Sequence, residues 1–371
     1  MIERLLVANR GEIARRVFTT CHRLGIETVA VHSDADAGLP FVREADLAVR
    51  LPGNTPAETY LRTDLVIDAA RRAGADAVHP GYGFLSENAD FARAVIAAGL
   101  TWVGPAPESI DQMGSKVESK KLMEAAGVPV LGNHTPDTAT EADLPLLVKA
   151  SAGGGGRGMR IVRSLEALPA EIATARAEAE SAFGDGTVFV EPYVENGRHV
   201  EVQVVGFADG HVAVLGERDC SIQRRHQKVV EEAPAPGLPQ EVRTALHDAA
   251  RAAAKAIDYR GAGTVEFLYD PVAERFFFLE MNTRLQVEHP VTEEVTGLDL
   301  VELQIAAAEG VTHPDLPTEP QGHAIEVRLY AEDPGSDWQP QSGLLTVFDV
   351  PGVAAEFSLS RGAGIRLDTG F

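Results

Sequence analysis

The sequence is most informative at Glu280-Met-Asn-Thr-Arg-Leu-Gln-Val-Glu288, which follows the apolar run Phe276-Phe-Phe-Leu279. The apolar run predicts a buried strand, and side chains two residues apart in an extended segment lie on the same side. An extended segment would therefore present one row of polar side chains, namely Glu280, Asn282, Arg284, Gln286 and Glu288. This row combines metal-type oxygens, a guanidinium and a second carboxylate, although alternating polar residues can also be the solvated face of a sheet.

A second strand is predicted just upstream, at Thr264-Val-Glu-Phe-Leu-Tyr269, with a turn-forming Asp-Pro pair between the two runs. If this hairpin folds symmetrically about Ala273, Glu266 lies opposite Glu280. Two facing carboxylates in a half-buried sheet repel each other unless a cation lies between them. With the Asn282 amide they form an oxygen-rich set that suits Mg²⁺ or Mn²⁺.

The composition limits the class of protein. The 371 residues, of which 44% are hydrophobic, predict two or three globular domains, and a net charge of −22 argues against binding to nucleic acid. The two cysteines, Cys21 and Cys220, allow no disulfide framework and indicate a reducing compartment. The first residues enter a strand pattern directly, without a signal sequence or a membrane segment. We therefore expect a cytoplasmic protein that binds neither nucleic acid nor a membrane.

The first 114 residues alternate short apolar strands with helical stretches, which predicts a parallel sheet with right-handed crossovers. The loops at 9–11 and 79–88 follow two of these strands, and an open α/β sheet binds its ligand at such strand ends. The predicted elements are strands at 5–8, 28–31, 77–79 and 101–104, and a helix at 12–24.

Beyond a boundary near residue 114, the pattern changes to a helix at 120–126 and then to a small lobe at about 130–205. A long alanine-rich helix at 240–257 precedes the hairpin. The lobe contains predicted strands at 146–149, 159–162 and 187–191 and a helix at 168–181, and two further strands are predicted at 323–330 and 343–348.

The glycine run Gly153-Gly-Gly-Gly-Arg-Gly158 has the spacing of a dinucleotide-binding loop, but the context argues against that site. A Rossmann loop leads into a helix, whereas a strand is predicted after this run, and no Walker A Lys-Ser/Thr pair follows. The remaining interpretations are a lid whose backbone N–H groups close over phosphates and a simple mobile turn. In the first case Lys149 supplies a positive charge to the phosphates.

A basic cluster, Gln223-Arg-Arg-His-Gln-Lys228, stands out in this acidic chain. Such runs often form a solvated face, and Asp219 and the pair at 231–232 could neutralise it. Together with Lys149 and Arg284, the cluster is better explained by a triphosphate and a small oxyanion. The reaction class indicated is phosphoryl transfer to a carboxylate-like acceptor.

Five motifs occur in this order along the chain: Val7-Ala-Asn-Arg-Gly-Glu-Ile-Ala14, His79-Pro-Gly-Tyr-Gly-Phe-Leu-Ser-Glu-Asn88, Lys149-Ala-Ser-Ala-Gly-Gly-Gly-Gly-Arg-Gly-Met159, Glu217-Arg-Asp-Cys-Ser-Ile-Gln-Arg-Arg-His-Gln-Lys228 and Glu280-Met-Asn-Thr-Arg-Leu-Gln-Val-Glu-His-Pro290. Together they resemble the signatures of biotin carboxylase, most closely in the α subunit of acyl-CoA carboxylases. The resemblance implies an α/β (α+β overall) ATP-grasp fold with a Rossmann-like parallel sheet at the amino terminus. It further implies an N-terminal domain at 1–114, an ATP-grasp domain at 115–318 with its lid at about 130–205, and the start of a β-rich C-terminal domain at 319–371.

The resemblance also implies a ligase that carboxylates biotin on a carrier protein, with ATP, Mg²⁺ or Mn²⁺ and bicarbonate. The implied partners are a biotin carboxyl carrier domain, in trans or beyond residue 371, a carboxyltransferase subunit, and a second copy in a homodimer or larger complex. The implied metal ligands are Glu266, Glu280 and Asn282. The implied ATP-binding residues are Lys116, Lys149, Gly153, Gly154, Gly155, Gly156, Gly158, Met159, Glu191, His199, Gln223 and His226.

For the second substrate, the resemblance implies that Glu288 is the base that deprotonates bicarbonate before it attacks the γ-phosphate. Arg328 would then stabilise the biotin enolate after carboxyphosphate has broken down to carbon dioxide and phosphate. A carboxylate within hydrogen-bond reach can take the bicarbonate proton, in agreement with this scheme. The residues implied to hold bicarbonate or biotin are Lys228, Arg284, Gln286, Val287, Arg328 and Tyr82.

The chain departs from the family pattern in two places. Glu191 is followed by Pro192-Tyr193 where a basic residue is usual, and proline removes a backbone N–H donor while leaving the Glu191 carbonyl for adenine. Family members also continue beyond the position that corresponds to Phe371, which indicates an incomplete C-terminal domain. Two alternatives therefore remain: another ATP-grasp ligase that acts through an acyl phosphate, and a nucleotide-binding module without catalysis.

Overall fold

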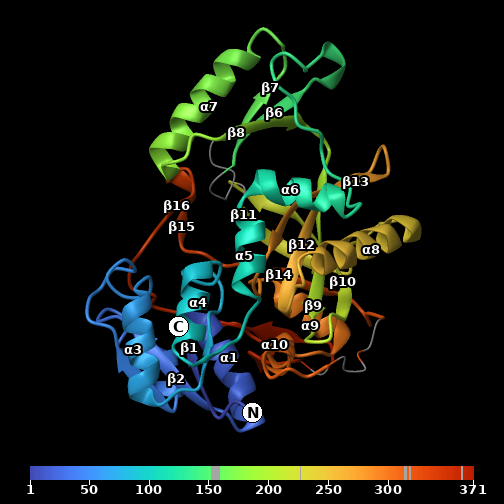
Figure 1. Ribbon diagram of the computed structural model, residues 1–371. Helices are drawn as coiled ribbons and strands as arrows, with labels where there is room; N and C mark the ends of the chain where they lie inside the picture. The colour runs from blue at the N-terminus through green and yellow to red at the C-terminus, as the bar shows by residue number, and fades with distance from the viewer. Residues whose placement is uncertain (152–158, 226, 313–315, 317–318, 361) are drawn as a thin grey trace.

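The computed structural model describes residues 1–151, 159–225, 227–312, 316, 319–360 and 362–371. Figure 1 shows a broad body, made of the amino-terminal region and a large antiparallel sheet, with a smaller lobe projecting from it. The predicted α/β class, with a parallel sheet first and antiparallel sheets after it, is confirmed.

The amino-terminal region is a parallel sheet in the order β3-β2-β1-β4-β5, covered by helices. Its central strand is buried on both faces, as near-continuous apolar strands in parallel sheets are, and Leu5, Leu6 and Val7 are inaccessible to solvent. The strands are β1 Arg4–Val7, β2 Glu27–His32, β3 Leu47–Arg50, β4 Ala77–His79 and β5 Thr101–Trp102, and the helices are α1 Gly11–Leu24, α2 Pro40–Glu44, α3 Thr63–Ala73, α4 Ala89–Ala97 and α5 Pro107–Gly114.

The two loops predicted to form the ligand edge of this sheet lie against each other. The Asn9 side-chain amide donates hydrogen bonds to the carbonyls of Pro80 (2.9 Å) and Tyr82 (2.7 Å). Gly81 lies between those carbonyls at φ +65°, and a Cβ there would lie 2.8 Å from the Asn9 amide nitrogen. Glycine is therefore required at position 81.

The central region is a six-stranded antiparallel sheet in the order β13-β12-β9-β10-β11-β14. Helix α8 packs on one face, where its side chains share a core with Val202, Val204 and Val265, while α10 joins the other face to the core of the amino-terminal region. The strands are β9 Arg198–Gly206, β10 Val212–Arg224, β11 Gln227–Ala233, β12 Gly261–Asp270, β13 Arg275–Asn282 and β14 Ala324–Val327, and the helices are α6 Lys116–Ala125, α8 Gln240–Ala256, α9 His289–Thr296 and α10 Leu300–Ala308.

The register of the β12–β13 hairpin is as predicted at the position that matters for the site, because Glu266 pairs with Glu280. A bulge follows Glu266, so that Phe267 pairs with Phe278 and not with residue 279. The turn at the hairpin tip is therefore one residue shorter than a hairpin symmetric about Ala273 would have. The predicted extended row is wrong beyond Asn282, because β13 ends there and the chain turns toward α9.

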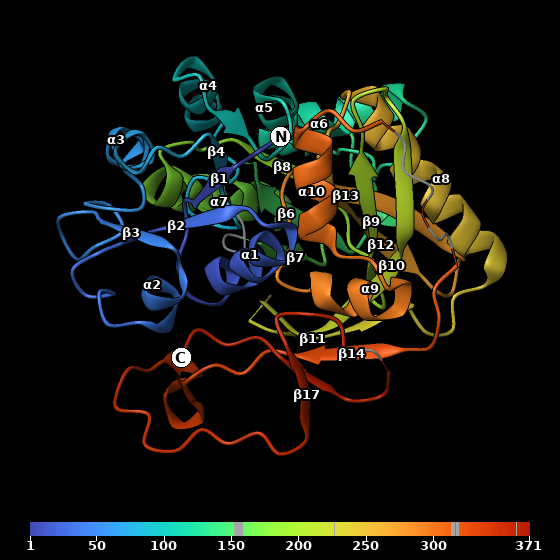
Figure 2. The same ribbon diagram turned by 90° about the horizontal axis from the view of Figure 1, so that it is seen from below.

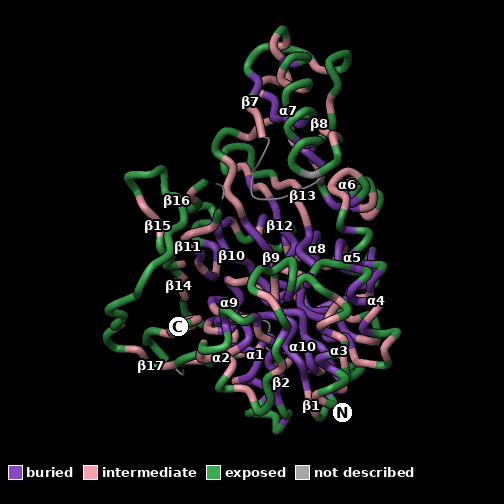
Figure 3. The backbone as a smooth tube through the Cα atoms, turned by 90° about the vertical axis from the view of Figure 1, so that its left-hand side faces the viewer, coloured by how far each residue is buried: buried purple, intermediate pink, exposed green. Residues whose placement is uncertain are grey.

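The projecting lobe is a three-stranded sheet in the order β7-β6-β8 with one helix packed on it. Its small core, which includes Val148, Val162 and Val190, is separate from that of the body, and Figure 3 shows the lobe standing apart from the buried interior. The glycine run at 153–158 lies outside the described residues. The elements of the lobe are β6 Leu146–Ala150, β7 Arg160–Val162, α7 Leu168–Phe183 and β8 Val188–Pro192, preceded by the 3₁₀ turn Glu141–Asp143.

The carboxy-terminal segment extends from β14 back to the amino-terminal region, where Arg15 donates a 2.7 Å hydrogen bond to the Thr369 carbonyl. Figure 2 shows it below β11 and β14. The predicted strand at 343–348 is wrong: Leu344 and Val347 are exposed, and no described sheet accepts their side chains. The segment contains only short strands, β15 Glu332–Asp333, β16 Gln339–Pro340, β17 Val353–Glu356 and β18 Ile365–Leu367, and the 3₁₀ turn Pro334–Ser336.

Other predicted elements differ mainly at their ends. Helix α6 begins at Lys116 rather than at residue 120, because the Ser115 side chain caps it by accepting from the Glu118 N–H. The strand predicted at 323–330 ends at Val327. Among the described residues, no helix is both long enough and apolar enough to cross a membrane.

Two buried histidines should make the folded protein less stable in mild acid. Burial lowers the pKa of His79 and of His289 to about 4, below the unfolded value of about 6.5. Both are neutral in the folded protein, so their contribution is present above pH ~6.5 and is lost as the pH falls toward 4. The free energy of unfolding, measured by urea denaturation, falls between pH 7 and pH 4. In His79→Gln this fall should be smaller than in the parent protein by up to ~3 kcal/mol.

The matched control is His323→Gln, because His323 is exposed and its ring lies 2.9 Å from the edge carboxylate of Glu232. The free energy of unfolding of this variant should change with pH as it does in the parent protein. An unchanged pH dependence in His79→Gln would show that His79 is not held neutral.

Candidate functional site

The site is organised around the ammonium group of Lys228, which β11 places over the central strands of the sheet. Its Nζ donates to Glu201 (2.5 Å), Glu266 (2.9 Å), Gln286 (3.1 Å) and Glu288 (2.5 Å). Burial alone would lower the pKa of Lys228, but the three carboxylates raise it well above its usual value. Lys228 is therefore a permanent cation that draws the acidic residues of the site together.

Glu288 is the acid best placed to exchange a proton with a small substrate. It lies at the cap of α9, almost fully buried, and its two oxygens accept from Lys228 (2.5 Å) and from Arg328 Nη2 (2.6 Å). Burial opposes ionisation, yet Lys228 and Arg328 hold the pKa of Glu288 below its usual value. The carboxylate is thus ionised at neutral pH, and an anion that takes over its cations would leave it a stronger base.

The predicted metal trio lies at the neighbouring hairpin, with its two acids paired across the strands. Glu266 is buried and accepts from Asn282 Nδ2 at 2.8 Å, and its Oε2 lies 2.8 Å from His199 Nε2. Glu280 is half-exposed and turns toward Lys116, whose Nζ is 3.3 Å away. The two carboxylates thus face different cationic groups.

The chemistry of this donor set fits a divalent cation. Glu266, Glu280 and Asn282 offer the hard oxygens that Mg²⁺ and Mn²⁺ prefer, and each carboxylate is already matched by positive charge from Lys116, Lys228 or His199. A second group with ligand atoms within 4.8 Å of one another is His199, Glu201 and Glu266. Glu266 belongs to both groups.

Of the two lysines implied for nucleotide binding, Lys149 lies at the buried Glu191 on β8, whereas Lys116 lies at Glu280. Lys149 and Lys120 both form ion pairs with the Glu191 carboxylate. Burial raises the pKa of Glu191, but these two lysines bring it below its usual value. The sequence predicted Lys149 here and missed Lys120, which α6 supplies from one helical turn after Lys116.

Of the other residues implied for the nucleotide, Gln223 contacts His199, with 3.1 Å between Gln223 Nε2 and His199 Nδ1. Met159 is part-buried just before β7. His226 and the glycines at 153, 154, 155, 156 and 158 lie outside the described residues.

The basic side chains of the cluster at 223–228 point to two different places. Lys228 points into the site, whereas Arg224 pairs with Glu332 and lies 4.3 Å from the centre of the Trp338 ring. Arg225 donates to the carbonyl of Asp337 at 2.9 Å. The expectation that the whole cluster surrounds a triphosphate is therefore wrong for these two arginines, which fasten the carboxy-terminal segment instead.

Arg284 reaches the site from the turn after β13. Its Nη2 donates to Asn282 Oδ1 at 3.0 Å, and its Nε donates to Glu87 Oε2 at 2.9 Å. Gln286 lies beside Lys228, and Val287 lies in the turn just before α9. The polar residues of the predicted row thus converge through a turn and not along a strand.

Tyr82 and Arg328 border the site from the amino-terminal and carboxy-terminal sides. The Tyr82 hydroxyl donates to Glu12, and burial together with this carboxylate raises its pKa well above 10. Arg328 follows β14 and its backbone N–H donates to the Val229 carbonyl at 3.0 Å. Both side chains therefore have fixed positions.

The sequence did not single out Glu201, Arg218 or Glu87 as site residues. Glu201 and Arg218 are fully buried, with 2.6 Å between Arg218 Nε and Glu201 Oε1, and Arg218 also donates to Thr292 on α9 at 2.8 Å. The available signal was a charged residue inside an apolar strand pattern, which requires a buried partner. Glu87 gave no such signal, because its contact with Arg284 spans two regions of the chain.

Two family models match the chain. Residues 1–110 match the model described as "Biotin carboxylase, N-terminal domain", and residues 113–316 match "Carbamoyl-phosphate synthase L chain, ATP binding domain".

A curated relative, the biotin carboxylase of Halalkalibacterium halodurans, is 50% identical over 379 aligned residues, which cover 99% of this chain and 81% of the relative. A solved Campylobacter jejuni biotin carboxylase, in a complex titled "beta-gamma-ATP", is 44% identical with a TM-score of 0.88, covering 92% of this chain and 78% of that one.

The biotin carboxylase domain dimer of a Hydrogenobacter thermophilus 2-oxoglutarate carboxylase is 45% identical with a TM-score of 0.89, covering 95% of this chain and 80% of that one. That dimer is in complex with MgADP, ADP and bicarbonate.

Proposed function

Because this chain belongs to the biotin carboxylase family, we propose that it carboxylates biotin on a carrier protein, using ATP and bicarbonate. The observation that supports this reaction best is the meeting of Glu288 with Lys228 and Arg328. A buried carboxylate between two cations is suited to a substrate that must both lose a proton and bind as an anion.

The nucleotide would lie between the lobe and the central sheet. Lys116, Lys149 and His199 would neutralise its phosphates, as basic side chains do in phosphoryl transfer, and the Glu191 carbonyl with the amides after Pro192 would recognise adenine. Glu266, Glu280 and Asn282 would hold Mg²⁺ or Mn²⁺, which neutralises phosphate charge when bound. The homologous complexes with a nucleotide, magnesium and bicarbonate support this assignment.

Bicarbonate would bind to Lys228, Arg284, Gln286 and the backbone of Val287. Glu288 takes the bicarbonate proton, and the resulting dianion attacks the γ-phosphorus of ATP to form carboxyphosphate and ADP. Carboxyphosphate breaks down to carbon dioxide and phosphate, and the phosphate takes the proton from the ureido N1 of biotin. Arg328 stabilises the biotin enolate, which attacks carbon dioxide to give carboxybiotin, while Tyr82 borders the biotin position.

The reaction would be the first half of a biotin-dependent carboxylase, with an acyl-CoA as the expected final acceptor. A separate carboxyltransferase would select that acceptor, and a biotin carboxyl carrier domain would bring the biotin. The dimeric Hydrogenobacter thermophilus domain supports a homodimer. We place the boundaries between domains at residues 114 and 318, with the lid at about 130–205.

The proposed function is tested by ATP hydrolysis with purified protein. Hydrolysis should require bicarbonate and should increase when free biotin is added. An increase with amine or thiol substrates instead of biotin would indicate a different ATP-grasp ligase. ATP binding with no hydrolysis under any of these conditions would contradict an enzymatic role.

A further inference from the structure

Two acidic residues beside Arg328 have no role in the proposed reaction. Glu231 on β11 and Glu326 on β14 are directly paired across the two strands, and side chains at such paired positions lie on the same face of a sheet. Glu231 is fully buried, and Glu326 is part-buried with its Oε2 shielded from solvent. Figure 2 shows β11 and β14 side by side next to α9, whose cap residue is Glu288.

The hydrogen bonds of this pair are incomplete among the described residues. Glu231 Oε1 lies 2.6 Å from Arg328 Nη2, but neither oxygen of Glu231 has an aligned hydrogen-bond donor. Glu326 Oε2 and Arg328 Nε also have no hydrogen-bond partner. A buried acceptor left without a donor is costly, and a proton on one of the two carboxyls would provide the missing donor.

The charges around the pair favour a single shared proton. Burial raises the pKa of Glu231 to about 7 and that of Glu326 well above its usual value. The groups that act on the pair are Arg328 on its own edge, Glu288 at α9, Glu201 on β9, and Asp368 and Tyr82 from the flanking segments. Since Arg328 is the one cation among them, it can balance one ionised carboxylate of the pair but not two.

Two carboxylates, those of Glu288 and Glu231, form ion pairs with Arg328, and only Glu288 changes charge in the proposed reaction. Arg328 Nη2 lies 2.6 Å from Glu288 and 2.6 Å from Glu231. When Glu288 takes the bicarbonate proton, its attraction for the guanidinium falls. Glu231 takes no part in that proton transfer and lies at the same distance, so it can hold Arg328 in place when Arg328 must act on biotin.

We propose that Glu231 is a positioning residue that holds Arg328 during biotin carboxylation, and that Glu326 carries a proton shared with Glu231. This inference rests on the proposed function. It predicts that loss of the Glu231 charge impairs the steps that involve biotin and leaves bicarbonate-dependent attack on ATP intact.

The test compares Glu231→Gln, Glu326→Gln and the control Glu232→Gln in two assays of the full chain. Glu232 is the next residue of β11, on the opposite face, where its carboxylate contacts the exposed His323. The first assay measures slow bicarbonate-dependent ATP hydrolysis without biotin. The second measures kcat and KM for free biotin across pH.

For Glu231→Gln we expect kcat with biotin to fall at least ~10-fold, because Arg328 loses one partner of a buried ion pair, with hydrolysis in the absence of biotin within ~2-fold of the parent. Glutamine at 326 resembles a protonated glutamate and can donate to Glu231, so Glu326→Gln should retain kcat at neutral pH. Its decline in activity at alkaline pH should shift to higher pH than in Glu232→Gln, because glutamine cannot lose the shared proton.

If the parent protein is active and Glu231→Gln has the same biotin-dependent kcat as the parent, the inference is overturned and the proposed function stands. Equal losses in both assays would also overturn it, because they would indicate a general structural role. If the parent protein shows no bicarbonate-dependent hydrolysis, the proposed function fails first.

Discussion

Replacing Glu288 with glutamine is expected to reduce biotin-dependent turnover by a factor of at least ~10², the usual range for loss of a general base. Glutamine has nearly the same shape, but its single carbonyl oxygen replaces only one of the two oxygens that accept from Lys228 and Arg328 at 2.5 and 2.6 Å in the parent protein. It cannot take the bicarbonate proton. The measurement is steady-state ATP hydrolysis with bicarbonate and biotin, together with a thermal unfolding curve to verify the fold.

The matched control is Glu294→Gln in the same helix, because Glu294 contacts Ser360 and Arg366, neither of which is a proposed substrate-binding residue. This variant should keep turnover within ~3-fold of the parent. A Glu288→Gln variant that retains more than a tenth of the parent turnover would exclude Glu288 as the base.

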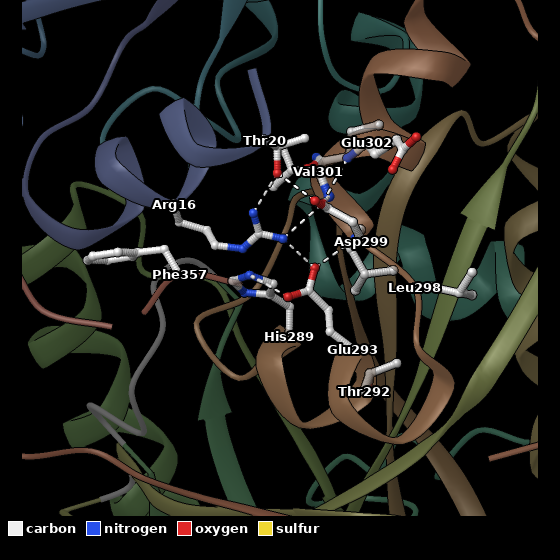
Figure 4. A network of polar contacts seen from close by, with 12 residues as sticks. Arg16, Thr20, His289, Thr292, Glu293, Leu298, Asp299, Val301, Glu302 and Phe357 are labelled. Atoms are coloured by element: carbon white, nitrogen blue, oxygen red, sulfur yellow. Dashed lines mark hydrogen bonds and ion pairs between the residues drawn. The ribbon is translucent and has the colours of Figure 1, made fainter. Parts of the chain in front are cut away.

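Replacing Arg16 with alanine is expected to lower the free energy of unfolding by ~3–5 kcal/mol, the scale for breaking a buried ion pair from one side. Figure 4 shows its guanidinium pointing at Glu293 and Asp299, with N–O distances of 2.6 and 2.8 Å. Arg16 and Glu293 are almost fully buried, and the truncation would leave Glu293 with Arg366 as its remaining arginine partner, at 2.7 Å. Urea denaturation measures the loss.

The control is Arg62→Ala, because the Arg62–Asp64 pair is largely exposed and such pairs contribute ~0–1 kcal/mol. Equal stability losses in the two variants would contradict the assigned role of Arg16. Since Arg16 lies on α1 and Glu293 on α9, the buried pair joins the amino-terminal region to the helix that begins at Glu288. We therefore expect Arg16→Ala to lower ATP hydrolysis as well as stability.

Local patterns predicted the elements that position the site. The pairing of Glu266 with Glu280 was predicted from a hairpin symmetric about Ala273, and a bulge at Phe267 changed the tip without changing that pair. The parallel sheet predicted that the loops at 9–11 and 79–88 lie at its ligand-binding edge, and the structure adds that they contact each other.

Long-range charge partners could not be predicted in the same way. Arg224 belongs to a basic run, but its partners Glu332 and Trp338 lie more than 100 residues away. The pairing of Glu231 with Glu326 depends on how β14 joins the sheet edge, which strand propensity does not specify. At 343–348, apolar residues predicted a strand, but a strand also requires a neighbouring strand to pair with.

The most direct test of the central account is the transfer of label from ¹⁴C-bicarbonate to free biotin by the purified chain. We predict acid-labile labelled carboxybiotin that forms only with ATP and a divalent cation, with at least one phosphate released for each label transferred, and that is lost in Glu288→Gln. ATP hydrolysis stimulated by biotin, without any transfer of label to biotin, would contradict the account.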